Sequence, residues 1–331
     1  MSPSVTALPP ETLPHVDQWL GPNWTARPLA GDASVRAYYR VTSASGETFI
    51  LAYYPPEVRG QLARFLAAYE AIDGHGTIPE VLQHCEVAVL QRDVGDRTLF
   101  DVLHDDRAEG LRLYREAIGL LVAFQQTGDR GLNPPFTAGF FLSELEMARE
   151  FYVEKLMGAP GEPLQPLLKT ISENIAQHPY VLCHRDYHGQ NLHVMNDALF
   201  LIDYQDLRMG PDTYDLASLL RDRGVARILG AGAELDLLGD YAARIGADAG
   251  GIRTRYFETL LQRSIKILGT FSKQPIVRGR MHYLDFIPAT VESIARCLDE
   301  LPAFAPLRDM FPLQFDLSAA RERVAELAAL R

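Results

Sequence analysis

The sequence contains few cysteines, and they form no recognisable pattern. There are three, Cys85, Cys183 and Cys297, which lie far apart and include no CxxC pair. An odd, scattered set cannot build the disulfide framework of a small secreted protein, and it lacks the paired spacing of a structural zinc site. This usage is typical of a reducing compartment, so we expect a cytoplasmic protein.

Long apolar segments are also missing. No stretch reaches the roughly 18 uninterrupted apolar residues that a membrane-spanning helix needs. The first twenty residues, MSPSVTALPPETLPHVDQWL, contain neither a basic n-region nor an apolar h-region. We therefore expect neither a signal peptide nor a membrane partner.

Positive charge is in short supply. The chain has 32 Lys and Arg against 43 Asp and Glu, which gives a formal net charge of −11. Such a surface repels nucleic acids and anionic membranes, so we expect neither as a partner. A polyanionic substrate would need a local cationic device, such as a metal ion.

The chain is long enough for a sizeable core. Its 331 residues, 47% of them hydrophobic, suit one large domain or two lobes. The first ninety residues favour strands, because β-branched and aromatic residues are frequent there. The expected strands are residues 24–30, 36–43, 47–56 and 86–91. Helical apolar spacing between the third and fourth of these predicts a helix over residues 57–72.

The pattern changes after a polar, glycine-containing stretch at residues 92–96. Most of the remainder has helical spacing. The expected helices are residues 109–126, 140–157, 164–177, 213–220, 232–244, 253–270, 287–300 and 317–330. A short group of strands, at residues 180–183, 192–195 and 199–203, interrupts them. The sequence thus predicts an α+β protein with an N-terminal nucleotide-binding lobe (1–91), a hinge (92–96) and a C-terminal catalytic and substrate lobe (97–331).

The densest polar stretch is VLCHRDYHGQNLHV, residues 181–194. His184, Arg185, Asp186 and Asn191 fit H-R-D-x-x-x-x-N, the catalytic loop of kinases, in which Asp is the base and Asn a magnesium ligand. Phosphoryl transfer needs an acceptor hydroxyl aimed in line and metal ions that neutralise the phosphate oxygens. We expect Asp186 to do the first and Asn191 to help with the second.

A second acidic residue follows at the right place. Asp203 ends the apolar run in LFLIDYQD, seventeen residues after Asp186. A carboxylate at the end of a strand lies at a sheet edge, where a hard cation can reach it. Either motif alone would suit an ordinary turn or helix cap. Together they predict a kinase that uses ATP and Mg²⁺, with Asn191 and Asp203 as metal ligands.

One position separates two kinds of kinase. Protein kinases usually carry Lys two residues after the catalytic Asp, whereas this chain has His188 in DYHGQN, and no A-P-E stretch follows. The motif resembles the H-x-D-x-H-x-x-N of the aminoglycoside phosphotransferase and choline kinase family, as does GPDTYDLASLL at residues 210–220. The resemblance implies a protein-kinase-like two-lobe fold, with a small antiparallel-sheet N-lobe and a large, mostly helical C-lobe. It also implies that His188 supports the loop and that Asp215 holds it through backbone N–H groups.

Softer motifs point to a narrower group. GDASVRAYYRV (31–41), YYPPE (53–57), LIDYQD and QRSIKILGTFSK (262–273) look like those of bacterial N-acetylmuramate/N-acetylglucosamine kinases, which phosphorylate an anomeric hydroxyl. This resemblance implies an amino sugar acceptor, phosphorylated at C1 for cell-wall sugar recycling. The expected partners are therefore a small sugar and ATP.

The chain departs from ordinary kinases at the phosphate loop. It has no G-x-G-x-x-G, and AGDASVR lies where that loop should be. Gly31 permits a tight turn, and the N–H groups of Asp32, Ala33 and Ser34 could cradle phosphate oxygens. An ordinary β-turn is the alternative for this stretch.

The chain also lacks the lysine that pairs with the phosphates in ordinary kinases. The expected place on the third strand is about Ala52, and no Lys occurs before residue 155. Arg36 and Arg40 are the nearest replacements, because Arg grips phosphate bidentately, although both also suit a surface. We expect Arg36 to contact ATP, and the backbones of Gln91 and Asp93 in the hinge strand to contact adenine.

Two rival functions stay open. An aminoglycoside, choline or homoserine O-phosphotransferase would want carboxylates and aromatic rings around its acceptor, and residues 142–155 (LSELEMAREFYVEK) offer both. The same segment also suits an acidic helix face in water. A non-catalytic, nucleotide-binding pseudokinase would explain the missing lysine. It would not explain why Asp186, Asn191 and Asp203 are all present.

Overall fold

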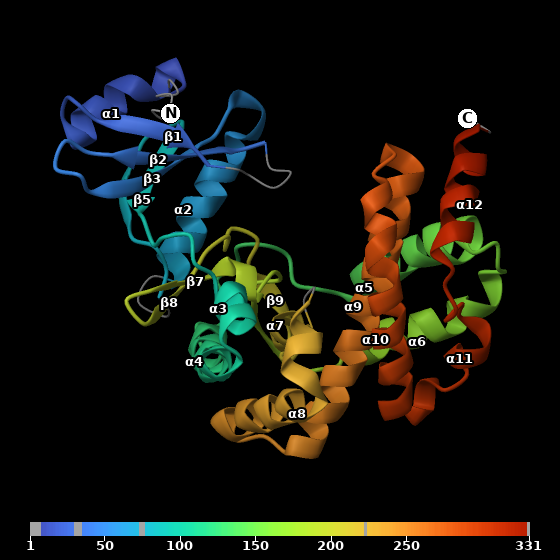
Figure 1. Cartoon of the computed structure of the whole chain (residues 1–331). Helices are drawn as coiled ribbons and strands as arrows, with labels where there is room; N and C mark the ends of the chain where they lie inside the picture. The colour runs from blue at the N-terminus through green and yellow to red at the C-terminus, as the bar shows by residue number, and fades with distance from the viewer. Residues whose placement is uncertain (1–7, 30–34, 73–76, 222–223, 330–331) are drawn as a thin grey trace. The chain divides into compact units, whose positions relative to one another are not determined.

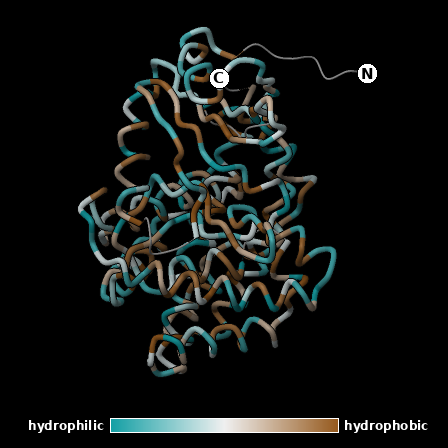
Figure 2. The backbone as a smooth tube through the Cα atoms, turned by 90° about the vertical axis from the view of Figure 1, so that its left-hand side faces the viewer, coloured by the Kyte–Doolittle hydropathy of each residue, from teal (hydrophilic) through white to brown (hydrophobic). Residues whose placement is uncertain are grey.

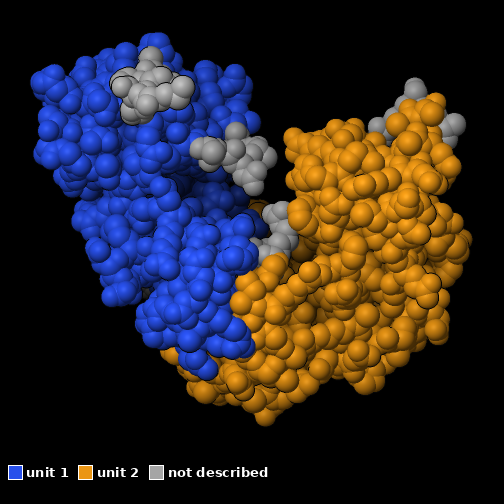
Figure 3. Space-filling view, viewed as in Figure 1, with its two compact units in different colours: residues 1–133, 186–207 blue, residues 134–185, 208–331 orange. Residues whose placement is uncertain are grey.

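The computed structural model describes residues 8–29, 35–72, 77–221 and 224–329 (Figure 1). The chain forms two compact units, coloured separately in Figure 3. Unit 1 comprises Met1–Asn133 and Asp186–Leu207, and unit 2 comprises Pro134–Arg185 and Arg208–Arg331. Unit 1 thus contains more than the expected N-terminal lobe, because it includes residues beyond the hinge and the segment that follows Arg185.

Unit 1 contains a five-stranded antiparallel sheet in the order β1-β2-β3-β5-β4. Its strands are β1 (Thr25–Pro28), β2 (Ala37–Thr42), β3 (Thr48–Tyr53), β4 (Val81–His84) and β5 (Ala88–Arg92). The four strands expected from the sequence are present. The edge strand β4 was missed, because VLQH is too short and too exposed to show an alternating pattern.

Helices cover the sheet of unit 1. The helix α1 (Leu13–Leu20), preceded by η1 (Pro10–Thr12), was not predicted. It packs on one face, where Val16 joins Val41 and Leu51 in a hydrophobic cluster. The expected helix is α2 (Gly60–Ile72), preceded by η2 (Pro56–Val58), and it lies on the other side of the sheet (Figure 1).

The rest of unit 1 carries the polar motif. Its elements are α3 (Leu99–Asp105), α4 (Arg107–Gln125), η5 (Gly189–Asn191), β7 (Leu192–Met195) and β8 (Ala198–Leu201). The expected hairpin is confirmed, with β7 pairing antiparallel with β8. Its two turn residues, Asn196 and Asp197, both have positive φ, as a two-residue type I′ turn requires.

Unit 2 is mostly helical. Its helices are α5 (Ala138–Ala148), η3 (Arg149–Leu156), η4 (Glu162–Leu164), α6 (Gln165–Ile175), α7 (Tyr214–Arg221), α8 (Val225–Ile245), α9 (Ala249–Arg278), η6 (Met281–Phe286), α10 (Ile287–Glu300), η7 (Pro302–Phe304), α11 (Leu307–Met310) and α12 (Leu317–Ala329). The one strand pair described in this unit is β6 (Tyr180–Cys183) with β9 (Arg208–Pro211). The sequence predicted β6 but not β9.

The long helix α9 is the centre of unit 2 and packs against α5, α7 and α10. Gly269 allows α5 to come close, because a Cβ at this position would lie 2.7 Å from the backbone nitrogen of Ala148. Within the described residues, no helix is long and apolar enough to span a membrane. Hydrophobic and hydrophilic residues alternate along the backbone (Figure 2).

Candidate active site

The polar loop of unit 1 is pressed against two helices. The buried Tyr187 donates a hydrogen bond from its hydroxyl to the carbonyl of Ala117 in α4, at 2.7 Å. A Cβ at Gly189 would lie 3.1 Å from the backbone nitrogen of Phe100 in α3 and 3.1 Å from the hydroxyl of Tyr114. A side chain at position 189 would therefore require these neighbours to shift by a few tenths of an ångström, a constraint that the motif alone did not reveal.

Three of the predicted site residues share this loop. The backbone N–H of His188 donates to the carbonyl of Asp186 at 3.0 Å, and that of Asn191 donates to the carbonyl of His188 at 2.9 Å. The side-chain Nδ2 of Asn191 also donates to the carbonyl of Asp186, at 2.9 Å. The amide nitrogen of Asn191 is thus used inside the loop, which leaves its Oδ1 for a cation. The Asp186 side chain is exposed.

Asp203 follows β8 and is joined to the same loop. The N–H of Ile202 donates to the carbonyl of Asn191 at 3.0 Å, which holds the two proposed metal ligands on neighbouring segments. Asp203 has a φ of 65°, which is uncommon for a residue other than glycine. Its Oδ1 accepts hydrogen bonds from Arg36 at 3.1 Å and from Gln205 at 3.0 Å.

Arg36 reaches this carboxylate from the start of β2. Its side chain is 10% exposed and forms an ion pair with Asp203. Burial alone would lower the pKa of Arg36, but Tyr38, Asp203 and Tyr54 together raise it. Arg36 is therefore a fixed cation beside the proposed metal site. The expected lysine position, Ala52, is buried in β3.

An aromatic stack connects α2 with the segment that carries Asp203. Tyr204 stacks on Phe65 with ring centroids 5.1 Å apart, and Phe65 lies 6.5 Å from Tyr54. Tyr54 in turn hydrogen-bonds Arg36. Sequence reasoning missed this stack. The one signal for it was an aromatic residue directly after Asp203.

Arg40, the second arginine expected near the phosphates, forms ion pairs with two carboxylates. The guanidinium of Arg40 binds Asp93 with contacts of 2.5 and 3.0 Å, and Asp96 with contacts of 2.7 and 2.8 Å. The alternative that Arg40 neutralises phosphate is therefore not favoured, because its donors already bind two carboxylates. The Asp93 carboxylate is likewise occupied, which leaves its backbone for the expected contact with adenine.

Two further predictions concern the adenine contact and the phosphate loop. Gln91 lies within the sheet, opposite Ile50 on one side and Val81 on the other, so its backbone belongs to the strand ladder. Any adenine contact is better placed at Asp93, after β5 ends. The phosphate-loop residues Gly31, Asp32, Ala33 and Ser34 lie outside the described residues.

The residues before Asp186 are anchored in unit 2. The buried carboxylate of Asp215 accepts hydrogen bonds from the N–H groups of His184 at 2.6 Å and Arg185 at 2.8 Å. Burial raises the pKa of Asp215, while His184, these two N–H groups and Arg263 act in the opposite direction. The expectation that Asp215 holds the loop through backbone N–H groups is confirmed.

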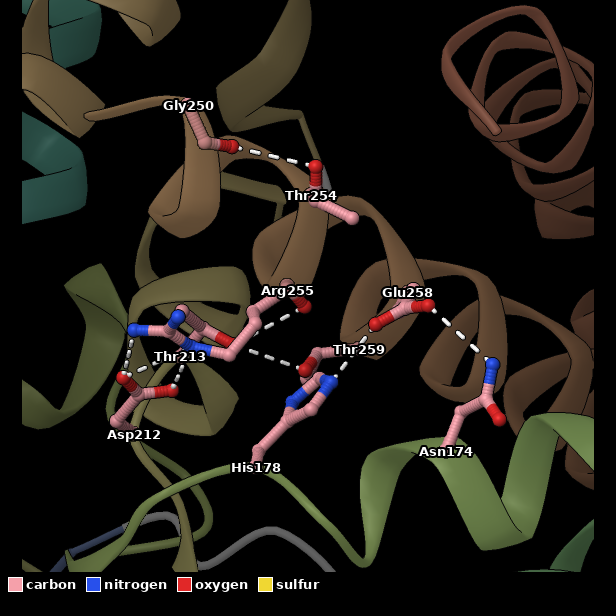
Figure 4. A network of polar contacts seen from close by, with 9 residues as sticks. All are labelled: Asn174, His178, Asp212, Thr213, Gly250, Thr254, Arg255, Glu258 and Thr259. Carbon is pink, nitrogen blue, oxygen red and sulfur yellow. Dashed lines mark hydrogen bonds and ion pairs between the residues drawn. The ribbon is translucent and has the colours of Figure 1, made fainter. Parts of the chain in front are cut away.

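A polar network fixes the outer ends of the β6–β9 pair (Figure 4). Asp212, directly after β9, is gripped by Arg255 of α9, with the shortest contact at 2.7 Å. His178, just before β6, has its Nε2 2.8 Å from Glu258 of α9. Both strands that lead to and from the segment 186–207 are therefore tied to the same helix, α9.

The acidic segment at residues 142–155 is already neutralised. It forms α5 and the π-helical η3 rather than one regular helix. The ion pairs of its carboxylates are Glu144 with Lys266, Glu146 and Glu154 with Arg149, and Glu150 with Lys155. A pocket for a cationic acceptor would have to break these pairs, so the structure does not favour one here.

The donor set suits magnesium. The loop offers the amide oxygen of Asn191 and the carboxylate of Asp203, both hard oxygen ligands. Asp186, which is exposed, lies in the same loop as Asn191. The residues present therefore fit a hard divalent cation carried with substrate phosphates.

The model of the phosphotransferase enzyme family matches residues 25–249. The chain belongs to this family. The match covers the sheet of unit 1 as well as the polar loop, Asp203 and Asp215. The family assignment confirms that the protein is a phosphotransferase enzyme.

Curated relatives of this phosphotransferase have a more specific name than the family. The chain is 28% identical over 297 residues to an N-acetylmuramate/N-acetylglucosamine kinase of Neisseria meningitidis serogroup B, covering 84% of this chain and 87% of the relative. It is 28% identical over 303 residues to the protein of the same name from Pseudomonas putida, covering 85% and 86%.

Solved structures confirm the fold. An ethanolamine kinase of Plasmodium vivax aligns with a TM-score of 0.63 and 12% identity, covering 92% of this chain and 93% of that one. An ADP-bound aminoglycoside phosphotransferase aligns with a TM-score of 0.61 and 15% identity, covering 88% and 98%. The phosphotransferase thus has the expected protein-kinase-like α+β fold.

Proposed function

We propose that the protein transfers the γ-phosphate of ATP to the anomeric C1 hydroxyl of an amino sugar, N-acetylglucosamine or N-acetylmuramate. The observation that carries the proposal is the loop that brings Asp186, Asn191 and Asp203 onto neighbouring segments of unit 1. The relatives named N-acetylmuramate/N-acetylglucosamine kinase support the choice of acceptor. We place the reaction in the cytoplasm, where ATP is available, and in the recycling of cell-wall sugars.

In this proposal Asp186 acts as the base. Its exposed carboxylate orients the C1 hydroxyl and accepts its proton as O1 attacks the γ-phosphorus. The bond from the γ-phosphorus to the bridging oxygen breaks, and ADP leaves with the electron pair. His188 helps to hold the loop, since its backbone bonds connect Asp186 to Asn191.

Asn191 and Asp203 would hold magnesium, which when bound neutralises the charge on the phosphate oxygens. Arg36 would supply the cationic contact that Ala52 cannot. The backbone of Asp93 would contact adenine.

The rival acceptors receive less support. Choline and aminoglycosides are cations, and the carboxylates of residues 142–155 that would attract them have partners of their own. A neutral or anionic sugar needs no such carboxylates. The pseudokinase alternative leaves the metal-ligand geometry of Asn191 and Asp203 without a purpose.

The test is the position of the transferred phosphate. We expect magnesium-dependent ADP release with N-acetylglucosamine or N-acetylmuramate, and none with their methyl glycosides, in which O1 is blocked. The product should be labile to mild acid, as a sugar 1-phosphate is. Asp186→Asn should lose several orders of magnitude in kcat while still binding ATP, because base catalysis acts in the transition state.

Phosphorylation of a methyl glycoside, or an acid-stable product, would move the reaction to another hydroxyl and contradict the C1 assignment. Turnover with kanamycin but not with either sugar would contradict the choice of acceptor. Near-normal turnover of Asp186→Asn would contradict the role of Asp186.

A further inference from the structure

Three side chains of unit 1 that play no part in the proposed reaction offer metal ligands to one point. His15, Cys85 and Glu86 each present one ligand atom, and these atoms lie within 4.8 Å of one another. The Nε2 of His15 is 3.7 Å from a carboxylate oxygen of Glu86. In the part of the chain that the structure describes, this is the one group of three such side chains.

We propose that His15, Cys85 and Glu86 bind a thiophilic divalent cation of the Zn²⁺ class, which clips α1 to the turn between β4 and β5. The proposal does not rest on the function proposed above. Imidazole, thiolate and carboxylate are the ligand types that zinc takes in proteins. One Cys thiolate, one neutral His and one carboxylate also balance the two charges of the cation.

Both segments that carry the ligands are held in place without a metal. Cys85 and Glu86 lie in a β-turn closed by a 2.9 Å hydrogen bond from the N–H of Cys85 to the carbonyl of Ala88. The N–H of Tyr54 ties the same turn to β3 through the carbonyl of Val87, at 2.8 Å.

His15 is fixed by its own helix. The next residue, Val16, is fully buried in the hydrophobic cluster on one face of the sheet. The ring of His15 lies 5.7 Å from that of Trp19. Ligands in a tetrahedral zinc site lie about 3.5 Å apart, given bonds of about 2.0 to 2.3 Å. The ligand atoms all lie within 4.8 Å of one another, so binding requires a contraction of at most about 1 Å, and the His15–Glu86 pair at 3.7 Å is already close to this spacing.

The site is open to a cation from one side. Cys85 and Glu86 also line an open groove of about 480 Å³ between α2 and the β4–β5 turn. The other lining residues are Arg59, Leu62, Ala63, Leu66 and His84. The Glu86 side chain is 73% exposed, so a cation and a water molecule as a fourth ligand can reach the group from solvent.

The test separates this site from the proposed magnesium site by ligand chemistry. The purified full chain is kept reduced and saturated with Mg²⁺, which prefers oxygen ligands, and is then titrated with Co²⁺ as a spectroscopic substitute for Zn²⁺. We expect one equivalent to bind with an intense near-ultraviolet thiolate-to-cobalt band, and Zn²⁺ to displace it. Cys85→Ser should abolish the band, and His15→Gln should weaken binding of both metals at least about tenfold.

His104→Gln is the matched control, because His104 is a surface histidine that pairs with Asp105 at 3.6 Å and has no thiol in that pair. It should bind Co²⁺ like the wild type. Circular dichroism and phosphotransfer activity at wild-type levels would show that Cys85→Ser is folded. Absence of the band in the wild type, or equal binding by Cys85→Ser, would overturn the proposal.

Discussion

The guanidinium of Arg36, directly before β2, reaches the carboxylate of Asp203. Protein kinases bring a cation to the phosphates from the third strand, where this chain has the buried Ala52. The ion pair at 3.1 Å and the contact with Tyr54 keep Arg36 beside the proposed metal ligand. We therefore propose that Arg36 takes over the role of the missing lysine.

Arg36→Gln should raise KM for ATP and lower kcat together. A charge-assisted contact is worth about 1.5–3 kcal/mol, so kcat/KM should fall about ten- to a hundredfold in steady-state assays. Arg59→Gln is the control, since Arg59 pairs with Glu11 instead, and its KM for ATP should stay close to that of the wild type. If Arg36→Gln left both constants unchanged, the phosphate contact would have to come from another residue.

At the scale of elements, the sequence predicted the helices and strands in which apolar residues recur at regular spacing. The strands β2, β3, β7 and β8 and most helices of unit 2 were expected close to their actual bounds. Asp186, Asn191 and Asp203 could be proposed as site residues because short linear motifs carry them, and the structure holds Asn191 and the residue before Asp203 together through the hydrogen bond from Ile202.

Elements whose identity depends on distant partners were missed. The segment β9 (RMGP) contains Gly and Pro, and it is a strand because β6 pairs with it, with Cys183 opposite Arg208. The helix α1 follows prolines, and its Val16 becomes buried only against strands that come later in the chain. The pairing of Arg40 with the hinge residues was equally invisible, since 53 residues separate Arg40 from Asp93.

The link from Arg40 in β2 to the segment after β5 should make stability depend on pH. Burial raises the pKa of Asp93, but hydrogen bonds from Arg40, Gly95 and Thr48 and the charge of Arg40 together outweigh this, and the pKa values of Asp93 and Asp96 are both lowered. A lowered folded-state pKa contributes stability above the unfolded value, about 3.9 for Asp, and this contribution is lost as the pH falls through the folded-state pKa. Arg40→Gln should therefore be less stable than the wild type at pH 7, and the difference should shrink below about pH 4.

Urea unfolding at pH 7, 5, 4 and 3 would measure this difference. Arg92→Gln is the matched control on β5, because Arg92 faces Glu80 at 3.6 Å with both side chains exposed, where an ion pair contributes little. If the stability difference between wild type and Arg40→Gln were the same at every pH, the ion pairs of Arg40 with Asp93 and Asp96 would not be the source of the pH dependence.

At the scale of the whole molecule, nucleotide binding should appear as thermal stability. A ligand that binds the folded protein alone stabilises it by about 2.7 kcal/mol at a concentration of about 100 times Kd. ATP with Mg²⁺ should therefore raise Tm, and ATP with EDTA should raise it less. In Asp203→Ala the two conditions should give the same Tm, because the proposed metal ligand is gone.

Differential scanning fluorimetry can follow all four combinations. Asp206→Ala is a suitable control, because Asp206 lies three residues further on and has no proposed role. It should keep the extra stabilisation by Mg²⁺. If Asp203→Ala responded to Mg²⁺ as the wild type does, the metal would be bound elsewhere.

The left-handed backbone at Asp203 implies a trade-off between stability and activity. An L-residue in this conformation costs about 1–2 kcal/mol relative to the usual regions, whereas glycine adopts it without that strain. Asp203→Gly should therefore be more stable than Asp203→Ala by about 1 kcal/mol in denaturant unfolding, although both lack the carboxylate and should be equally inactive. Selection for folding alone would favour glycine at this position. The proposed metal ligand thus occupies a position whose backbone conformation its own side chain does not favour.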